Sequence, residues 1–273
     1  MSVDQVPVQA PAETAVPVLR VDDLAVHYGG IKAVDGVSFE VAPGELVGLI
    51  GPNGSGKSTL LAAVSRLTTL TRGALWLDGG RYESVQPCGP ARLGIGRTFQ
   101  TVRVLEEQTV RQNIQLGADL GARKAAPTTS SPLRLFGGLR RKGGSDTVDE
   151  VLERTGLQDV ASVLVDELPY GLRRRVEIAR ALATRPRLLL LDEPLAGMTS
   201  EERADVAALV RQLHGEGLAQ ILVEHDVDFI VKTCPRLIAL DQGKVIAEGA
   251  PADVVADDRV RTAYLGVDDD DAA

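Results

Sequence analysis

The chain has 273 residues, of which 44% are hydrophobic and 25% charged, as is typical of a globular protein with a substantial core. Its 38 acidic residues outnumber its 30 basic ones, and the net charge of -8 argues against a nucleic-acid partner, because Lys and Arg bind phosphate backbones. No run approaches the roughly 18 apolar residues that cross a bilayer, and residues 1–17 do not resemble a secretory signal. If the protein works at a membrane, we expect another chain to hold it there.

The two ends of the chain and one internal segment differ in composition from the rest. Residues 1–17 predict a flexible leader, and residues 267–273 predict a frayed acidic tail. Between them, residues 18–266 predict one main domain. Pro, Gly, Ser, Arg and Lys are abundant between Gly121 and Ser145, so we predict a mobile loop over residues 121–146, inside a helical lobe of about residues 101–180. For this loop, a basic contact with lipid headgroups or a partner is the alternative.

The first strand signals are near the N-terminus. Val18–Tyr28 and Ile31–Val41 alternate apolar and polar residues around a Gly-Gly pair, which predicts an antiparallel hairpin. Leu46–Ile50 is wholly apolar, as is typical of a buried parallel strand. After a glycine-rich turn, a helix is predicted by four apolar residues on one face, namely Leu60, Leu61, Val64 and Leu67.

Further strand signals follow in the C-terminal half. Leu188–Leu191 and Gln220–Val223 are predicted to be buried strands, and Leu237–Leu240 begins a second hairpin that turns at residues 241–244. Buried strands that alternate with helices indicate an α/β domain on a parallel sheet. The two cysteines, Cys88 and Cys234, are far apart in the sequence and are predicted to be reduced thiols.

A phosphate-binding loop lies between the strand that ends at residue 50 and the following helix. The spacing of its glycines, lysine and hydroxyl residues is that of a P-loop, whose backbone N–H groups surround phosphate oxygens. We expect Lys57 to contact the β- and γ-phosphates and the Ser58 hydroxyl to bind Mg²⁺. The loop consists of Gly51, Pro52, Asn53, Gly54, Ser55, Gly56, Lys57, Ser58 and Thr59.

Two adjacent carboxylates complete the predicted site. Asp192 and Glu193 follow the strand Leu188–Leu191, at the strand end where α/β sheets bind ligands. Asp192 is expected to hold Mg²⁺, directly or through water, and Glu193 to orient and deprotonate the attacking water. The sequence therefore predicts a site that binds a nucleotide with Mg²⁺, and a P-loop alone leaves GTPases open as well; the family resemblance described below implies that the nucleotide is ATP and the chain an ATPase. A P-loop small-molecule kinase is the alternative, but that class explains neither the signature segment nor His225, which are described next.

From these motifs the chain resembles the ATP-binding cassette (ABC) family over about residues 18–266. The resemblance implies that Tyr28 stacks on adenine, with strand packing as the alternative. It implies that Gln100 senses Mg²⁺ and water and faces the membrane partner. It also implies that His225 contacts the γ-phosphate, with a structural histidine as the alternative. The fold implied is a P-loop NTPase core, a mixed or parallel sheet flanked by helices, with an N-terminal antiparallel β subdomain and an inserted helical subdomain.

The segment Leu168–Arg175 is similar to the signature motif of that family. The resemblance implies that Pro169, Tyr170 and Gly171 cap the ATP bound by a second ABC ATPase subunit, a copy or a relative of this chain. Proline replaces the usual serine at 169 and leucine the usual glutamine at Leu172, so the cap must rely on backbone N–H groups and the helix dipole. Thr199 replaces the usual aspartate of the D-loop. We interpret the arginines at 173, 174 and 175 as a solvated basic face.

Several segments are similar to the ATPases of branched-chain amino-acid importers, among them residues 96–100, 174–180, 193–198 and 261–266. The resemblance implies a peripheral protein at the cytoplasmic face of the cell membrane, held by permeases that an extracytoplasmic solute-binding protein feeds. Motors for urea or lipopolysaccharide, and a non-transport ABC ATPase of DNA repair or translation, are the alternatives. Four residues near Gln100 are expected to line a permease groove or, equally, the core of the helical lobe, namely Phe99, Val102, Val104 and Leu105.

Overall fold

The computed structural model describes residues 16–85, 90–122 and 144–265. Most of the predicted leader, the whole acidic tail and Cys88 lie outside these residues. Cys234 is a buried free thiol, and burial raises its pKa to about 12. Along the described segments, no helix combines the length and the apolar character that crossing a membrane requires.

The smaller of the two sheets is antiparallel and contains the predicted first hairpin, with strand order β2-β1-β4-β5. Its strands are β1 (Leu19–Tyr28), β2 (Ile31–Val41), β4 (Arg72–Leu77) and β5 (Gly80–Arg81). Tyr28 pairs with Ile31 across the turn, where Gly29 takes a φ of 59°. The N-terminal antiparallel subdomain is therefore confirmed.

The larger sheet is mixed, with strand order β10-β9-β3-β8-β7-β6. Its strands are β3 (Leu46–Ile50), β6 (Ile95–Arg97), β7 (Leu188–Asp192), β8 (Ala219–Val223), β9 (Arg236–Asp241) and β10 (Lys244–Gly249). All pairs are parallel except β9 with β10, which form the predicted second hairpin. Every residue of β3, β7 and β8 is buried, which explains why these runs are apolar rather than alternating, apart from Asp192 in β7 and Gln220 in β8.

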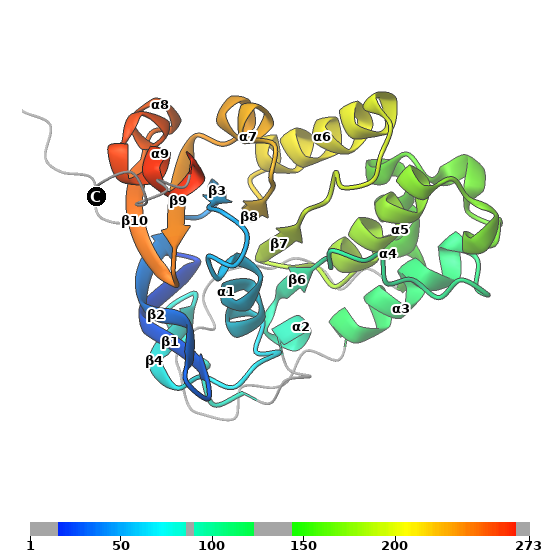
Figure 1. The fold of residues 1–273 in the computed structure, drawn as a ribbon. Helices are drawn as coiled ribbons and strands as arrows, with labels where there is room; N and C mark the ends of the chain where they lie inside the picture. Colours follow the sequence, from blue (N-terminus) through cyan, green and yellow to red (C-terminus); the bar gives the residue numbers. More distant parts are fainter. Residues whose placement is uncertain (1–15, 86–89, 123–143, 266–273) are drawn as a thin grey trace, which may run out of the picture.

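Helices cover the larger sheet and form a lobe beside it (Figure 1). They are α1 (Lys57–Val64), α2 (Pro90–Leu93), α3 (Val110–Ala122), α4 (Gly144–Thr155), α5 (Tyr170–Ala183), α6 (Ser200–Gly215), α7 (Val227–Thr233), α8 (Pro251–Ala256) and α9 (Asp258–Leu265). Figure 1 shows α6 and α7 on one side of the larger sheet and α1 on the other. Helices α3, α4 and α5 make up the predicted helical lobe, so the predicted fold class is confirmed.

Two local predictions need correction. The expected loop over residues 121–146 is helical at both ends, because α3 continues through Ala122 and α4 begins at Gly144; residues 123–143 lie outside the described part. Leu67 does not belong to the helix that starts at Lys57. That helix ends at Val64, and Leu67 is 48% exposed. The reason is Arg66, whose φ of 55° is left-handed and cannot continue a right-handed helix.

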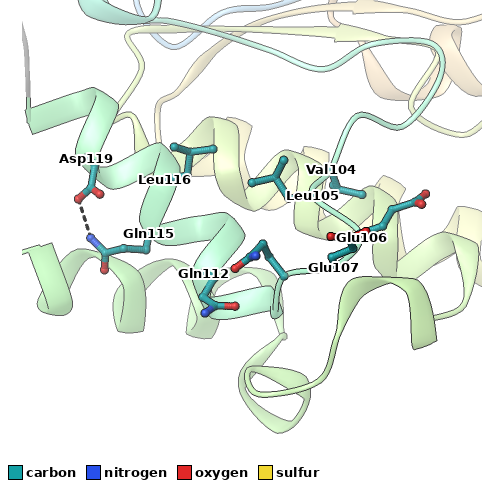
Figure 2. A pocket seen from close by; sticks show the side chains of 9 residues that line it. Val104, Leu105, Glu106, Glu107, Gln112, Gln115, Leu116 and Asp119 are labelled. Carbon is teal, nitrogen blue, oxygen red and sulfur yellow. Dashed lines mark hydrogen bonds between the residues drawn. The ribbon is translucent and has the colours of Figure 1, made fainter.

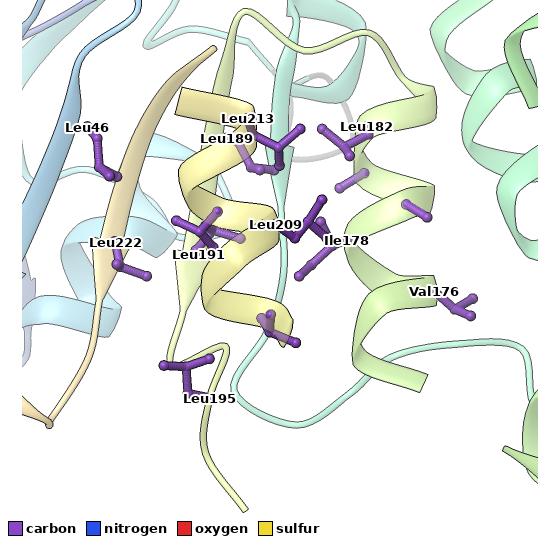
Figure 3. Close-up of a cluster of buried hydrophobic side chains, with 14 of the residues drawn as sticks. Leu46, Val176, Ile178, Leu182, Leu189, Leu191, Leu195, Leu209, Leu213 and Leu222 are labelled. Atoms are coloured by element: carbon purple, nitrogen blue, oxygen red, sulfur yellow. The ribbon is translucent and has the colours of Figure 1, made fainter. Parts of the chain in front are cut away.

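Helix α6 packs between the larger sheet and α5, the helix that begins within the signature segment (Figure 3). Leu209 and Leu213 of α6 belong to the same buried cluster as Leu191 of β7 and Ile178 of α5. Burying such a side chain fully stabilises a fold by about 1.5–3 kcal/mol. This apolar contact holds α5 at a fixed position relative to the strand that carries Asp192 and Glu193.

Candidate active site

The phosphate loop connects the C-terminal end of β3 to α1 through three glycines in left-handed conformations. Gly51, Gly54 and Gly56 have φ values of 149°, 82° and 105°. A Cβ atom on Gly56 would lie 2.3 Å from the carbonyl oxygen of Ala33, so no larger residue fits there. Gly56 caps α1 without a side-chain hydrogen bond, and the first turn of α1 has no acidic residue. This helix N-terminus therefore suits a phosphate group.

Lys57 lies at the start of α1 and curls back along the loop. Its ammonium group donates hydrogen bonds to the carbonyl oxygens of Gly51 at 2.7 Å and Pro52 at 2.9 Å. The side chain is only 6% exposed. Burial lowers the pKa of Lys57, while the carboxylates of Glu193 and Asp192 act in the opposite direction. The structure thus brings the predicted phosphate-binding lysine and the two predicted carboxylates into electrostatic contact.

Asp192 is buried at the end of β7 with one oxygen paired and the other unpaired. Arg97 of β6 donates to Asp192 Oδ2 at 3.1 Å, whereas Asp192 Oδ1 has no hydrogen-bond partner. Burial raises the pKa of this carboxyl group, although the neighbouring Arg97 and Ser58 side chains oppose the shift. Sequence analysis did not assign Arg97, because only the fold places it beside β7.

These groups fit Mg²⁺. The unpaired Asp192 Oδ1 and the Ser58 hydroxyl are the oxygen ligands that Mg²⁺ prefers. Within the described residues, no group of three or more His, Cys, Asp and Glu side chains could hold a metal. Asp192 and Ser58 are the residues of this chain that would hold the ion. When bound, Mg²⁺ neutralises charge on the phosphates.

The three predicted catalytic residues meet at the carboxylate of Glu193. Gln100 donates from Nε2 to Glu193 Oε2 at 3.0 Å, and His225 Nε2 lies 2.6 Å from Glu193 Oε1. Glu193 has a φ of 48°, a left-handed conformation that costs a non-glycine residue about 1 kcal/mol or more. Each oxygen of the Glu193 carboxylate has one of these partners and keeps a second lone pair that can accept a hydrogen bond from an attacking water.

The arginines of α5 do not form the solvated basic face that we predicted. Arg174 is fully buried and pairs with Glu177 at 2.8 Å, and its Nη2 donates to the carbonyl oxygen of Gln100 at 2.8 Å. Glu177 in turn accepts hydrogen bonds from the backbone N–H groups of Phe99 and Arg103, both at 3.2 Å. The buried pair thus attaches α5 to the segment that carries Gln100. The sequence signal for this ion pair is the spacing of three residues between Arg174 and Glu177, which places both on one face of a helix.

The predicted signature residues lie at the start of α5. Pro169 is the N-cap of this helix, and Tyr170 is 39% exposed. The backbone N–H of Gly171 donates to Glu202 Oε1 of α6 at 2.9 Å. Thr199, which replaces the expected D-loop aspartate, is the N-cap of α6 and forms a capping box with Glu202. Glu202 therefore connects Gly171 of the signature to Thr199 at the start of α6.

Two aromatic residues lie near the edges of the site. Tyr28 is 52% exposed, and its hydroxyl forms a 2.8 Å hydrogen bond with Thr68, which follows α1. Adenine stacking on Tyr28 stays a prediction. Tyr264 of α9 was not assigned a role from the sequence, yet its hydroxyl accepts a 2.7 Å hydrogen bond from the backbone N–H of Gly51. The C-terminal helix thus contacts the phosphate loop directly.

A groove of about 620 Å³ lies on the helical lobe, next to the segment that follows Gln100 (Figure 2). Val104 and Leu105 line it, and Leu105 is 46% exposed; its use as a permease groove stays a prediction. Val104 also packs on the core of the helical lobe, so its side chain both lines the groove and contacts the core. Phe99 is not in this groove, and the guanidinium of Arg103 lies 4.2 Å from the centre of its ring.

Comparison with known proteins agrees with this geometry. Residues 34–196 match the family model "ABC transporter", and residues 244–270 match "Branched-chain amino acid ATP-binding cassette transporter". The chain is 36% identical to the high-affinity branched-chain amino acid transport ATP-binding protein LivG of Escherichia coli, covering 92% of this chain and 98% of LivG. It is 34% identical to the corresponding BraF protein of Pseudomonas aeruginosa, with the same coverage.

Solved structures give the same result. The ADP conformation of MJ1267, an ATP-binding cassette of an ABC transporter, superposes with a TM-score of 0.77 at 30% identity, covering 92% of this chain and 99% of that one. A dimeric, post-hydrolysis state of the cassette MJ0796 bound to ADP and Pi superposes with a TM-score of 0.69 at 25% identity, covering 85% and 98%.

The fold, the phosphate loop and the carboxylates at the end of β7 define an ATPase of the cassette type, and the chain belongs to the ABC transporter family of ATP-binding proteins. Within that family, its relatives include ATP-binding proteins of branched-chain amino acid transport. The recognition made from the sequence motifs is therefore confirmed.

Proposed function

We propose that this chain is the motor subunit of an importer for branched-chain amino acids. It pairs with a second ABC ATPase, a copy or a relative, and lies at the cytoplasmic face of the membrane under permeases that a solute-binding protein feeds. The convergence of Gln100 and His225 on Glu193 carries the proposed mechanism. The identity to LivG and BraF supports the solute class, as does the family match over residues 244–270.

The proposed reaction uses groups that already lie together. Lys57 and the backbone N–H groups of the phosphate loop bind the nucleotide phosphates, and the adjacent Asp192 and Ser58 hold the ion that accompanies them. Glu193 accepts a proton from the attacking water at one of its carboxylate oxygens. Gln100 and His225, which now bond to that carboxylate, reorient the water and the γ-phosphate once nucleotide is present.

Uptake measurements test the solute class. In a strain that lacks the gene for this chain, uptake of radiolabelled leucine, isoleucine and valine should fall, and the restored gene should recover it. Uptake of an unrelated amino acid such as lysine serves as the control. Unchanged uptake of all three branched-chain amino acids would refute the proposed solute class, although it would leave the ATPase assignment in place.

The groove next to Val104 and Leu105 is the proposed contact with the permease. It lies in the segment that begins at Gln100, so a permease element seated there would act on the residue bonded to Glu193. Its lining combines exposed Leu105 and Leu116 with polar residues such as Gln112, which suits a partly apolar protein segment.

Leu105→Asp should uncouple transport from hydrolysis. A carboxylate buried at this contact is costly, so we expect uptake and co-purification with the membrane to fall about tenfold or more, while the isolated protein still hydrolyses ATP. Leu67→Asp is the matched control, because Leu67 is 48% exposed and Leu105 46%, and Leu67 lies outside this groove. Normal uptake by Leu105→Asp would show that the permease contacts another surface.

A further inference from the structure

The backbone N–H of Gly171 already has an anionic partner within the same chain. It donates to Glu202 Oε1 at 2.9 Å, and Glu202 belongs to a different helix, α6. The side chain of Glu202 packs directly on this residue: a Cβ atom on Gly171 would lie 2.7 Å from Glu202 Cγ and 2.8 Å from Oε1. Glycine is therefore needed at 171 for this contact.

The local sequence explains why this N–H takes a distant partner. The first N–H groups of a helix have no intrahelical acceptor, and a side chain at the N-cap commonly supplies one. The N-cap of α5 is Pro169, which makes no side-chain cap hydrogen bond, and the first turn of α5 contains no acidic residue. Glu202 therefore supplies from α6 the acceptor that Pro169 lacks.

The second carboxylate oxygen of Glu202 bonds to Thr199, the residue at the D-loop position. Glu202 Oε2 accepts from the backbone N–H of Thr199 at 3.0 Å and lies 3.0 Å from the Thr199 hydroxyl. Hydrogen bonds from the Thr199 backbone and from Gly171 lower the pKa of Glu202, so the group is a carboxylate at neutral pH. One charged side chain thus joins the start of α5 to the start of α6.

The same N–H group is needed for the proposed function. Because Pro169 has no hydroxyl, the cap on the partner's nucleotide relies on backbone N–H groups at the start of α5, and Gly171 is among them. The N–H of Gly171 donates its one hydrogen to Glu202 at 2.9 Å, so it cannot donate a second strong hydrogen bond to a phosphate. A γ-phosphate that approached it would also meet the negative charge of Glu202, and like charges this close repel.

We propose that Glu202 is an internal latch, a carboxylate that occupies the Gly171 amide and leaves it when the partner's γ-phosphate is capped. This inference rests on the proposed closure of two ATPase subunits across bound ATP. Release of the latch frees the start of α5 from Thr199, so capping of one nucleotide changes the D-loop region of the same chain.

Glu202→Gln tests the latch through the ATP dependence of dimer formation. Glu193→Gln is used as the background so that ATP is not consumed, and dimer is measured by sedimentation velocity over a range of Mg-ATP concentrations. Loss of one charge opposite the incoming phosphate should lower the half-maximal ATP concentration by about threefold to tenfold. Glu201→Gln is the matched control, because Glu201 lies in the same helical turn and its removal changes the net charge equally.

A second measurement reports the contact itself. Hydrogen exchange at the Gly171 amide of the chain without nucleotide should be slow in the parent and in Glu201→Ala and faster in Glu202→Ala, whose side chain has no acceptor. Thermal unfolding confirms that both variants are folded. An unchanged exchange rate at Gly171 would overturn the proposal.

The dimer titration also separates this proposal from the proposed function. Equal half-maximal ATP concentrations for Glu202→Gln and Glu201→Gln would overturn the latch, and a higher value for Glu202→Gln would show that Glu202 supports the cap instead. Absence of an ATP-dependent dimer in the parent and in both variants would instead refute closure across ATP, which is the premise. Nucleotide binding by the monomer should be equal in all three proteins.

Discussion

Replacing Lys57 by alanine should weaken ATP binding by at least about 100-fold. The ammonium group is the one side-chain cation at the start of α1, and we expect it to form charge-assisted hydrogen bonds with two phosphates, each worth about 1.5–3 kcal/mol. This group donates hydrogen bonds to the carbonyl oxygens of Gly51 and Pro52 and is thereby held in the loop. Fluorescent-nucleotide titration or calorimetry measures the loss.

Two controls make the result specific. Lys232→Ala removes an exposed lysine at the last turn of α7 and should bind ATP as the parent does. A thermal melt of Lys57→Ala shows whether the buried site tolerates the change, since Asp192 keeps its partner Arg97 at 3.1 Å. Unchanged ATP affinity in folded Lys57→Ala would contradict the assignment of residues 51–59 as the phosphate loop.

The strands and the phosphate loop are predictable because local signals agree there. Leu46–Ile50 and Leu188–Leu191 are wholly apolar, as is typical of strands that are buried on both faces. Each run is followed by residues that are typical of phosphate or metal sites. The hairpin turn at Gln242 and Gly243, with φ values of 46° and 78°, likewise follows from local sequence. Fold class and site location are therefore encoded within short windows.

Residues whose role depends on distant parts of the chain were not predictable in this way. Arg174 and Arg173 look alike in sequence, yet Arg174 is fully buried because Glu177 and the carbonyl oxygen of Gln100 compensate its charge. Glu202 looks like an ordinary capping-box residue, since its contact with Gly171 spans two helices. A periodic pattern indicates which face of a helix or strand is buried. It does not indicate which side chain of another element will be the hydrogen-bond partner, because that depends on the fold.

Glu193→Gln should retain ATP binding and lose hydrolysis. Glutamine has nearly the same shape, but its amide cannot take a proton from water, and loss of a general base typically costs about 10²- to 10⁴-fold in rate. Gln100 and His225 still find a hydrogen-bonding group at this position, so the fold should persist. Phosphate release measures turnover, and sedimentation in Mg-ATP should show an accumulated dimer.

ATP binding and turnover, measured in both Glu193→Gln and Lys57→Ala, distinguish two roles of Glu193. If Glu193 only stabilised the nucleotide-free site through Gln100 and His225, its amide variant would bind ATP differently and still hydrolyse it. If Glu193 acts on water, ATP binding stays and turnover is lost, whereas in Lys57→Ala turnover falls because ATP binds more weakly. Turnover by Glu193→Gln at the rate of the parent would exclude Glu193 as the base. Another group near the His225 side chain, which is 48% exposed, would then have to accept the proton.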